Sequence, residues 1–176
     1  NRELSTYNMH ERKLKSLDSI ITNQGLSLAS YSDQQPTMLV FLRHFGCTFC
    51  KEALQEIKKN RAAIESEGTK IILVHLVDEL EAAAATRKYH IADLPRISDP
   101  EKKLYKAFGL RRGSFVQLLG FNVIIRGIVA GLIKGNFPEK PNADPFQMPG
   151  VFLLFKGAVL QTFKHTTSAD RPDYIE

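Results

Sequence analysis

The sequence predicts an α/β fold in which a central mixed sheet is flanked by helices. Three observations lead to this prediction. Short apolar runs typical of buried strands alternate with segments of helical spacing, in the order strand, helix, strand, helix. Two further strand-like runs joined by a tight turn lie near the C-terminal end. The only two cysteines, Cys47 and Cys50, stand where the first predicted strand gives way to a helix.

The chain is expected to divide at residue 36. Residues 1–35 are polar and are expected to form an N-terminal helical extension, with a helix near 11–21 and a turn at 32–36. Residues 36–176 are expected to form the main domain. A chain of 176 residues fits one domain and is long enough to bury a core of its own.

The first half of this domain begins with a strand, a helix and a second strand. The apolar run 37–42 predicts a buried strand. Apolar residues at helical spacing after Cys50 predict a helix that ends at Gly68. The run 71–77 predicts a second buried strand, so these elements are typical of a parallel βαβ unit.

Helix caps mark the next elements. Asp78 is the expected N-cap of a helix that extends to Tyr89. Residues 95–98 are expected to form a short extended segment. Asp99, followed by a proline at the first helical position, is the expected N-cap of another helix, which ends at Gly109.

Residues 114–134 are apolar nearly all round and are expected to form an inserted helix. A transmembrane helix needs about 20 apolar residues with few polar interruptions. Asn122 and Arg126 stand in the middle of this segment, so a transmembrane span is disfavoured. Two interpretations stay open: the helix packs on the domain or at a homodimer interface, or it contacts a membrane surface.

The C-terminal part is expected to contain a β-hairpin. Residues 135–149 are rich in Pro, Gly, Asn and Asp, which predicts a loop. The run 151–155 predicts a strong strand, residues 156–158 a turn, and residues 159–164 a returning strand.

Composition and charge argue against two classes of protein, those that bind nucleic acids and those that are secreted with a disulfide scaffold. Lys and Arg total 24 against 19 Asp and Glu, giving a net charge of +5, but the basic residues are scattered. A nucleic-acid-binding protein would concentrate them in a stripe or carry a known module, so no nucleic-acid partner is expected. The N-terminal residues lack the apolar stretch of a signal peptide, and two cysteines are too few for a secreted disulfide scaffold. We therefore expect a cytoplasmic protein.

The motif at residues 47–50, Cys-Thr-Phe-Cys, carries the predicted chemistry. Backbone N–H groups and the helix dipole stabilise a thiolate at a helix N-terminus, where the pKa of a cysteine can fall well below about 8.5. Two intervening residues let both sulfurs meet across the first helical turn, so the dithiol can close to a disulfide. Four neighbouring residues are the expected supporting groups: Arg43, His44, Thr48 and Lys51.

Two structural alternatives compete with a redox pair. Zinc usually needs four ligands, and neither a second Cys pair nor suitably spaced histidines are present, so no metal is expected. An inert buried pair is the other alternative, since free cysteine is among the most buried residue types. A Cys-x-x-Cys at a strand-to-helix junction is instead typical of the thioredoxin-like redox fold. His44 and Lys51, taken singly, are more often solvated surface groups than catalytic ones.

Pro149 stands directly before the strand predicted at 151–155. In thioredoxin-like folds a cis-proline at the equivalent place faces the cysteines, and Pro149 is where this sequence would put it. The alternative is an ordinary trans proline that opens a strand. The expected catalytic residues are therefore Cys47, Cys50 and Pro149.

Longer stretches of the chain resemble a known family. The segment 41–53, Phe-Leu-Arg-His-Phe-Gly-Cys-Thr-Phe-Cys-Lys-Glu-Ala, looks like the active-site stretch of the peroxiredoxin-like 2 family, a group of AhpC/TSA-type antioxidant domains that includes selenoprotein-L-like proteins. The segments 98–105, 147–152 and 165–170, together with the apolar insert, follow the order of that family. The resemblance covers residues 37–173.

The resemblance implies a thioredoxin fold with an inserted helix, and reduction of peroxides through a Cys47/Cys50 dithiol–disulfide cycle. It leaves the roles of the two sulfurs open. Aligned to typical peroxiredoxins, Cys47 takes the position of a threonine and Cys50 attacks the peroxide; aligned to thioredoxin, Cys47 attacks and Cys50 resolves. We favour Cys50 as the attacking thiol. Arg43 stands where typical peroxiredoxins have a proline, and Arg43 and Arg171 are the candidates for the active-site arginine of the family.

Three function hypotheses follow. In the first, a thiolate attacks a peroxide, becomes a sulfenic acid and condenses with the other cysteine to a disulfide. An external thioredoxin-type dithiol then reduces the disulfide, with no cofactor bound. The second is a thioredoxin-like disulfide oxidoreductase without peroxidase activity, acting on a disulfide substrate. The third is a membrane-surface or protein-binding module that uses residues 114–134 and carries vestigial thiols.

Overall fold

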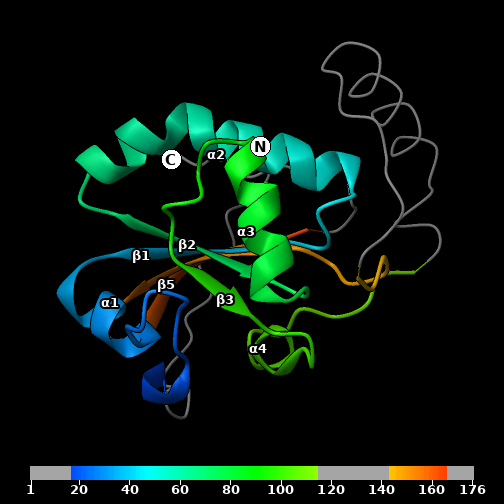
Figure 1. Ribbon diagram of the computed structural model, residues 1–176. Coiled ribbons are helices and arrows are strands. Elements are labelled where there is room, and N and C mark those ends of the chain that lie inside the picture. Colours follow the sequence, from blue (N-terminus) through cyan, green and yellow to red (C-terminus); the bar gives the residue numbers. More distant parts are fainter. Residues whose placement is uncertain (1–16, 115–142, 166–176) are drawn as a thin grey trace, which may run out of the picture.

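The computed structural model describes residues 17–114 and 143–165, which form a five-stranded sheet with helices on both faces (Figure 1). The strands are β1 (Thr37–Phe41), β2 (Lys70–His75), β3 (Arg96–Ser98), β4 (Gly150–Phe155) and β5 (Ala158–Lys164). Their order across the sheet is β3-β2-β1-β4-β5. The first three strands run parallel, and β4 and β5 are antiparallel to their neighbours. The predicted α/β class with a central mixed sheet is confirmed.

β1 is the middle strand of the sheet, which explains why its residues are mostly apolar. Every side chain from Thr37 to Phe41 is buried, as expected for a strand that is covered on both faces. Val40 pairs with Leu73 of β2 on one side and with Val151 of β4 on the other. The carboxyl end of β1 therefore lies between two neighbouring strands, and the loop that follows it starts at the middle of the sheet.

The helices divide between the two faces. They are a 3₁₀ helix η1 (Leu17–Ser19), α1 (Leu28–Gln34), α2 (Thr48–Ser66), α3 (Glu79–Lys88) and α4 (Lys103–Ala107). Figure 1 shows α2 and α3 over one face of the sheet, and α1 and α4 over the other. Leu54 of α2 packs in one core with Val40, while Tyr31 of α1 and Tyr105 of α4 pack in a second core with Phe41. Alternate residues of β1 therefore belong to opposite cores.

The sequence prediction of a turn at 32–36 is wrong, because α1 continues to Gln34. Ser27 is its N-cap and accepts a hydrogen bond from the backbone N–H of Ser30 at 3.1 Å. Leu28 of this helix is fully buried. Packing against the sheet thus overrides the turn preference of the Ser-Asp pair that follows.

The predicted helix start at Asp99 is also wrong, although its carboxylate does cap a helix. Asp99 accepts hydrogen bonds from the N–H groups of Lys103, Leu104 and Tyr105 at 2.9, 2.7 and 3.2 Å. The intervening residues form a turn, in which the N–H of Lys102 donates to the carbonyl of Asp99 at 3.0 Å. The cap therefore acts from outside the helix, which begins at Lys103.

Other predicted elements are found with small shifts. Asp78 accepts a hydrogen bond from the N–H of Glu81 at 2.8 Å, so the cap of α3 is confirmed. The hairpin turn consists of Lys156 and Gly157, with φ values of 50° and 73°, and Ala158 already belongs to β5. The positive φ at both positions is typical of the tight turns that join antiparallel strands.

Several predictions concern residues outside the described ranges. The helix expected near 11–21 lies mostly outside them, and so does the apolar segment 114–134 beyond Ser114. The division of the chain at residue 36 stays a prediction. None of the helices in the described ranges has the length and apolar character that crossing a membrane requires.

Candidate active site

The two cysteines lie where β1 ends and α2 begins. Cys47 is the N-cap of α2, and Cys50 lies in the first turn of that helix. The N–H of Leu42 donates to the carbonyl of Val74 at 2.9 Å, which holds the start of the connecting loop against β2. The strand-to-helix setting expected for the motif is therefore present. The free N–H groups and the dipole at the start of α2 favour negative charge at this position.

Both thiols are free and buried, with 5% of Cys47 and 4% of Cys50 exposed. They line an open pocket of about 350 Å³, a volume that includes its solvent-filled mouth. Arg43, Pro149 and His165 line the same pocket, and the rest of its wall is apolar. The structure thus brings together the three residues that the sequence analysis named as catalytic.

Arg43 is the charged side chain that contacts Cys47. Its Nη2 donates to Cys47 Sγ at 2.6 Å, and its backbone N–H donates to Cys50 Sγ at 3.4 Å. Only 7% of Arg43 is exposed. Its Nε and Nη1 have no hydrogen-bond partner in the part of the chain that the structure describes. A buried guanidinium in contact with a sulfur favours the thiolate over the thiol.

The two sulfurs differ in their affinity for protons. The hydrogen bond from Cys50, together with the charges of Arg43 and His44, lowers the pKa of Cys47 well below its ordinary value despite the opposing effect of burial. The same hydrogen bond, together with burial, raises the pKa of Cys50 well above its ordinary value. The contact with the guanidinium of Arg43 thus favours Cys47 over Cys50 as the site of the thiolate.

The supporting residues are buried, so the expectation that His44 and Lys51 are solvated surface groups is wrong. The exposed fractions are 6% for His44, 7% for Thr48 and 6% for Lys51. Burial lowers the pKa of His44, against the attraction of the charges on Cys47 and Asp144. Since His44 directly precedes the Phe-Gly turn that leads into α2, the loop itself carries these polar groups into the interior.

Pro149 lines the same pocket as the two cysteines, and of the two forms left open by the sequence its peptide bond takes the trans form. All peptide bonds in the ranges 17–114 and 143–165 are trans. The N–H of Met148 donates to the carbonyl of Arg111 at 3.1 Å, and Gln147 forms an antiparallel bridge with Arg112. These contacts hold the segment in place with the isomer that an X–Pro bond ordinarily prefers.

His165 is a pocket residue that sequence reasoning did not place in the site. Gly150 of β4 pairs with Lys164 of β5, so the residue that follows β5 lies beside the residue that precedes β4. This register carries His165 to the pocket wall next to Pro149. The hairpin itself was predicted, but placing His165 beside Pro149 requires the residue-by-residue pairing of β4 with β5. That pairing shifts between Leu153 and Leu154, so it could not be counted outward from the turn.

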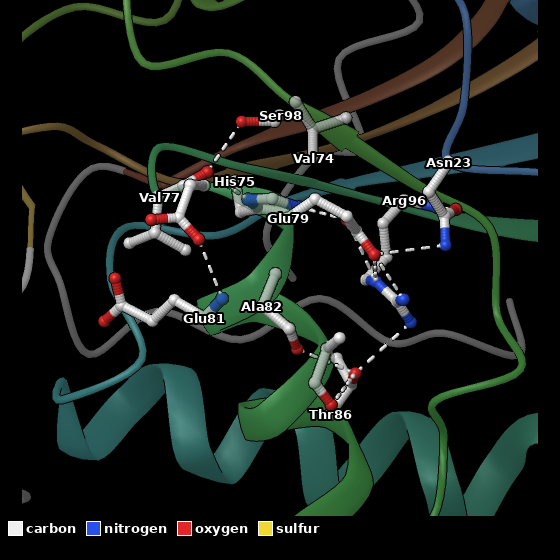
Figure 2. Close-up of polar contacts among 12 residues, drawn as sticks. Asn23, Val74, His75, Val77, Glu79, Glu81, Ala82, Thr86, Arg96 and Ser98 are labelled. Atoms are coloured by element: carbon white, nitrogen blue, oxygen red, sulfur yellow. Dashed lines mark hydrogen bonds and ion pairs between the residues drawn. The ribbon is translucent and has the colours of Figure 1, made fainter.

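A network of polar contacts joins residues of β2, β3 and α3 (Figure 2). The His75 ring lies 5.9 Å from the ring of Phe45 in the loop, and its Nδ1 lies 3.0 Å from the carbonyl oxygen of Val77. Its Nε2 lies 3.7 Å from Glu79, which accepts a hydrogen bond from Arg96 at 2.5 Å. The contact between Phe45 and His75 thus links the loop that contains Arg43 to this polar network.

Two other expectations concern ligands and a second arginine. In the ranges 17–114 and 143–165, no three His, Cys, Asp or Glu side chains are grouped so that they could hold a metal ion. Arg171, the other candidate for the active-site arginine, lies outside the described residues.

The chain is similar to known proteins in sequence and in fold. Residues 10–154 match the AhpC/TSA family. The chain is 26% identical over 166 residues to a prostamide/prostaglandin F synthase of Xenopus tropicalis, covering 88% of this chain and 77% of that protein. It is 22% identical over 147 residues to peroxiredoxin-like 2C of Bos taurus, covering 75% of this chain and 61% of that protein.

A solved structure shows the same fold. The bacterioferritin comigratory protein of Xanthomonas campestris superimposes with a TM-score of 0.59 at 14% identity, covering 85% of this chain and 82% of that chain. The resemblance to peroxiredoxin-like proteins stated from the motifs is thereby confirmed. With a family match over residues 10–154 and a buried dithiol at the strand-to-helix junction, the chain belongs to the AhpC/TSA family and is a thiol oxidoreductase of thioredoxin-like fold.

Proposed function

We propose that the chain reduces peroxides, with Cys47 as the attacking thiolate and Cys50 as the resolving thiol. The observation that carries this proposal is the 2.6 Å contact between Arg43 Nη2 and Cys47 Sγ in a buried pocket. The thiolate is the nucleophilic form of cysteine, and Arg43 favours it at Cys47. These roles follow the thioredoxin alignment and are opposite to the preference for Cys50 that the sequence led to.

The first step consumes the peroxide. The Cys47 thiolate attacks one peroxide oxygen, the O–O bond breaks, and the departing oxygen takes up a proton to leave as an alcohol or water. Cys47 becomes a sulfenic acid. Arg43 Nε and Nη1 are buried donors without partners among the described residues, so they are available to stabilise negative charge on the departing oxygen.

The second step forms the disulfide. Cys50 attacks the sulfenic sulfur of Cys47, its proton and the hydroxyl leave as water, and the two sulfurs join. The hydrogen bond to the Cys47 thiolate is the main cause that raises the pKa of Cys50. Once the sulfenic acid forms, that thiolate is gone, so Cys50 loses its proton more readily. Cys50 therefore becomes a better nucleophile only after Cys47 has been oxidised.

An external dithiol completes the proposed cycle. A thioredoxin-type dithiol attacks the Cys47–Cys50 disulfide and leaves as a disulfide, which returns both cysteines to their starting state. This scheme needs no bound cofactor. It also suits a reducing compartment such as the cytoplasm, where dithiol reductants are maintained.

Serine substitutions of the two cysteines test the proposal through consumption of hydrogen peroxide and of an organic hydroperoxide. Cys47→Ser is expected to lose turnover and the first stoichiometric reaction with peroxide. Cys50→Ser is expected to keep one fast equivalent and lose dithiol-dependent turnover. Peroxide consumption that survives in Cys47→Ser would overturn the proposed roles.

A disulfide oxidoreductase without peroxidase activity is the second candidate function. The observation that favours it is that Cys47, the attacking residue in the thioredoxin alignment, is the N-cap of α2 and accepts a hydrogen bond from Arg43. A wild-type chain that forms and reduces its disulfide reversibly, but consumes neither peroxide, would assign this function instead. The third hypothesis, a membrane-surface or protein-binding module, concerns residues that are mostly outside the described ranges.

A further inference from the structure

We propose that the Cys47–Cys50 disulfide is an oxidant of dithiols, because the buried guanidinium of Arg43 stabilises the reduced pair over the disulfide. This inference rests on the proposed function in one respect, namely that Cys47 and Cys50 form a disulfide. It goes further in assigning the position of the redox equilibrium to one side chain: Arg43 makes the disulfide easier to reduce than it would be without a buried positive charge beside Cys47.

The argument starts from the surroundings of Arg43. Only 7% of Arg43 is exposed, and its Nη2 donates to Cys47 Sγ at 2.6 Å. Its other two nitrogens, Nε and Nη1, have no acceptor among the described residues. The two sulfurs are the groups that favour its charged form against burial. In the reduced protein, the thiolate of Cys47 is therefore the counter-charge of Arg43.

Disulfide formation removes that counter-charge. The guanidinium then remains as a buried cation whose contact at Nη2 is to a neutral sulfur. Lys51 and His44 are buried in the same loop and helix turn, and neither can supply negative charge. Glu52 is a buried carboxylate in that helix turn, but among the described residues neither Nε nor Nη1 of Arg43 has a hydrogen-bond partner, so no carboxylate contacts these nitrogens. Removing one partner of a buried ion pair is strongly destabilising, because the remaining charge stays desolvated. The oxidised state is thus disfavoured relative to the reduced state.

A disulfide whose reduced form is stabilised is a strong oxidant. A thiolate of the partner dithiol attacks Cys47 Sγ, and Cys50 leaves and takes up a proton. The second partner thiolate then attacks the partner sulfur of the mixed disulfide, and Cys47 leaves as the thiolate that Arg43 receives. The partner loses two electrons and two thiol protons and gains a disulfide. One proton ends on Cys50 and one is released to solvent.

The apolar wall of the pocket restricts the partner. Both cysteines are at most 5% exposed and line a pocket whose wall, apart from Arg43 and His165, is otherwise apolar. Dithiols that can enter this pocket, either small molecules or cysteines in a flexible peptide segment, are therefore the chemical class that fits.

The experiment equilibrates the full chain with mixtures of reduced and oxidised glutathione and counts free thiols by alkylation and mass. Arg43→Met is expected to shift the equilibrium towards the disulfide by about tenfold or more, equal to about 30 mV for this two-electron couple. The thiol–disulfide equilibrium constant of Arg43→Lys is expected to lie between those of the wild type and Arg43→Met. Arg87→Met, a substitution of an exposed arginine on α3, should match the wild type. Equal equilibrium constants for wild type and Arg43→Met would overturn the inference.

A second measurement needs no substitution. The reduced wild-type chain is expected to unfold at a higher temperature than the oxidised chain, although a cross-link ordinarily stabilises a fold. A higher unfolding temperature for the oxidised chain would contradict the inference. If the glutathione equilibrium behaves as expected but no peroxide is consumed, the peroxidase function fails and the inference stands. If peroxide is consumed but Arg43→Met has no effect on the equilibrium, the inference fails alone.

Discussion

Substitution of Arg43 by methionine removes one buried charge and keeps a side chain of similar length. Arg43 Nη2 lies 2.6 Å from Cys47 Sγ. Two opposite unit charges about 4 Å apart attract by about 4 kcal/mol at an effective dielectric constant of about 20. The open mouth of the pocket screens part of this attraction. If about a third to two thirds remains, the thiolate population falls by about tenfold to a hundredfold, since about 1.4 kcal/mol equals a factor of ten.

The assay is the rate of alkylation of Cys47 by iodoacetamide as a function of pH. A Cys50→Ser background leaves Cys47 as the only cysteine, and the serine hydroxyl can still donate to it. In Arg43→Met the inflection is expected to move to higher pH, and the rate below it to fall by about tenfold to a hundredfold. The alkaline plateau is expected to rise, because a more basic thiolate is more nucleophilic. Identical inflections with Arg43 and Met would refute the reasoning, and Arg87→Met is the matched control.

Three other predictions concern stability. Tyr105→Phe removes a fully buried hydroxyl that donates to the carbonyls of Leu42 and Val74, and is expected to cost about 1–2 kcal/mol; an unchanged urea midpoint would contradict this. Asp99→Ala leaves three N–H groups at the start of α4 without their acceptor and is expected to cost about 1–3 kcal/mol in thermal unfolding, with Asp99→Asn recovering part. The pKa of Cys47 is lower in the folded than in the unfolded chain. Its contribution to stability is therefore complete above about pH 8.5 and is lost as the pH falls through the folded value, so Cys47→Ser should show a flatter pH profile of unfolding.

Local sequence signals predicted most of the fold because they act over a few residues. The run 37–42 is apolar throughout, and it forms a strand that is buried on both faces. The Cys-x-x-Cys at its end is found at the N-terminus of α2, as expected. The two errors in helix boundaries arise where distant contacts decide. Leu28 becomes helical by packing on the sheet, and Asp99 caps α4 across an intervening turn.

The site was only partly predictable for the same reason. The sequence identified Cys47 and Cys50 as a redox pair, but alignment alone could not say which sulfur carries the charge. That depends on the side chain of Arg43 turning back onto Cys47. The burial of Lys51 depends on how α2 packs on the sheet, and the approach of His165 to the pocket depends on the register between β4 and β5. Neither contact has a signal in local spacing.

The most direct test of the account is the position of the sulfenic acid after treatment with one equivalent of peroxide. Dimedone would trap it, and peptide mass spectrometry would locate the adduct in Cys50→Ser and in Cys47→Ser. The Arg43 contact and the hydrogen bond from Cys50 predict an adduct on Cys47 in the first variant and none in the second. An adduct on Cys50 in Cys47→Ser, formed as fast as peroxide is consumed by the wild type, would contradict the account.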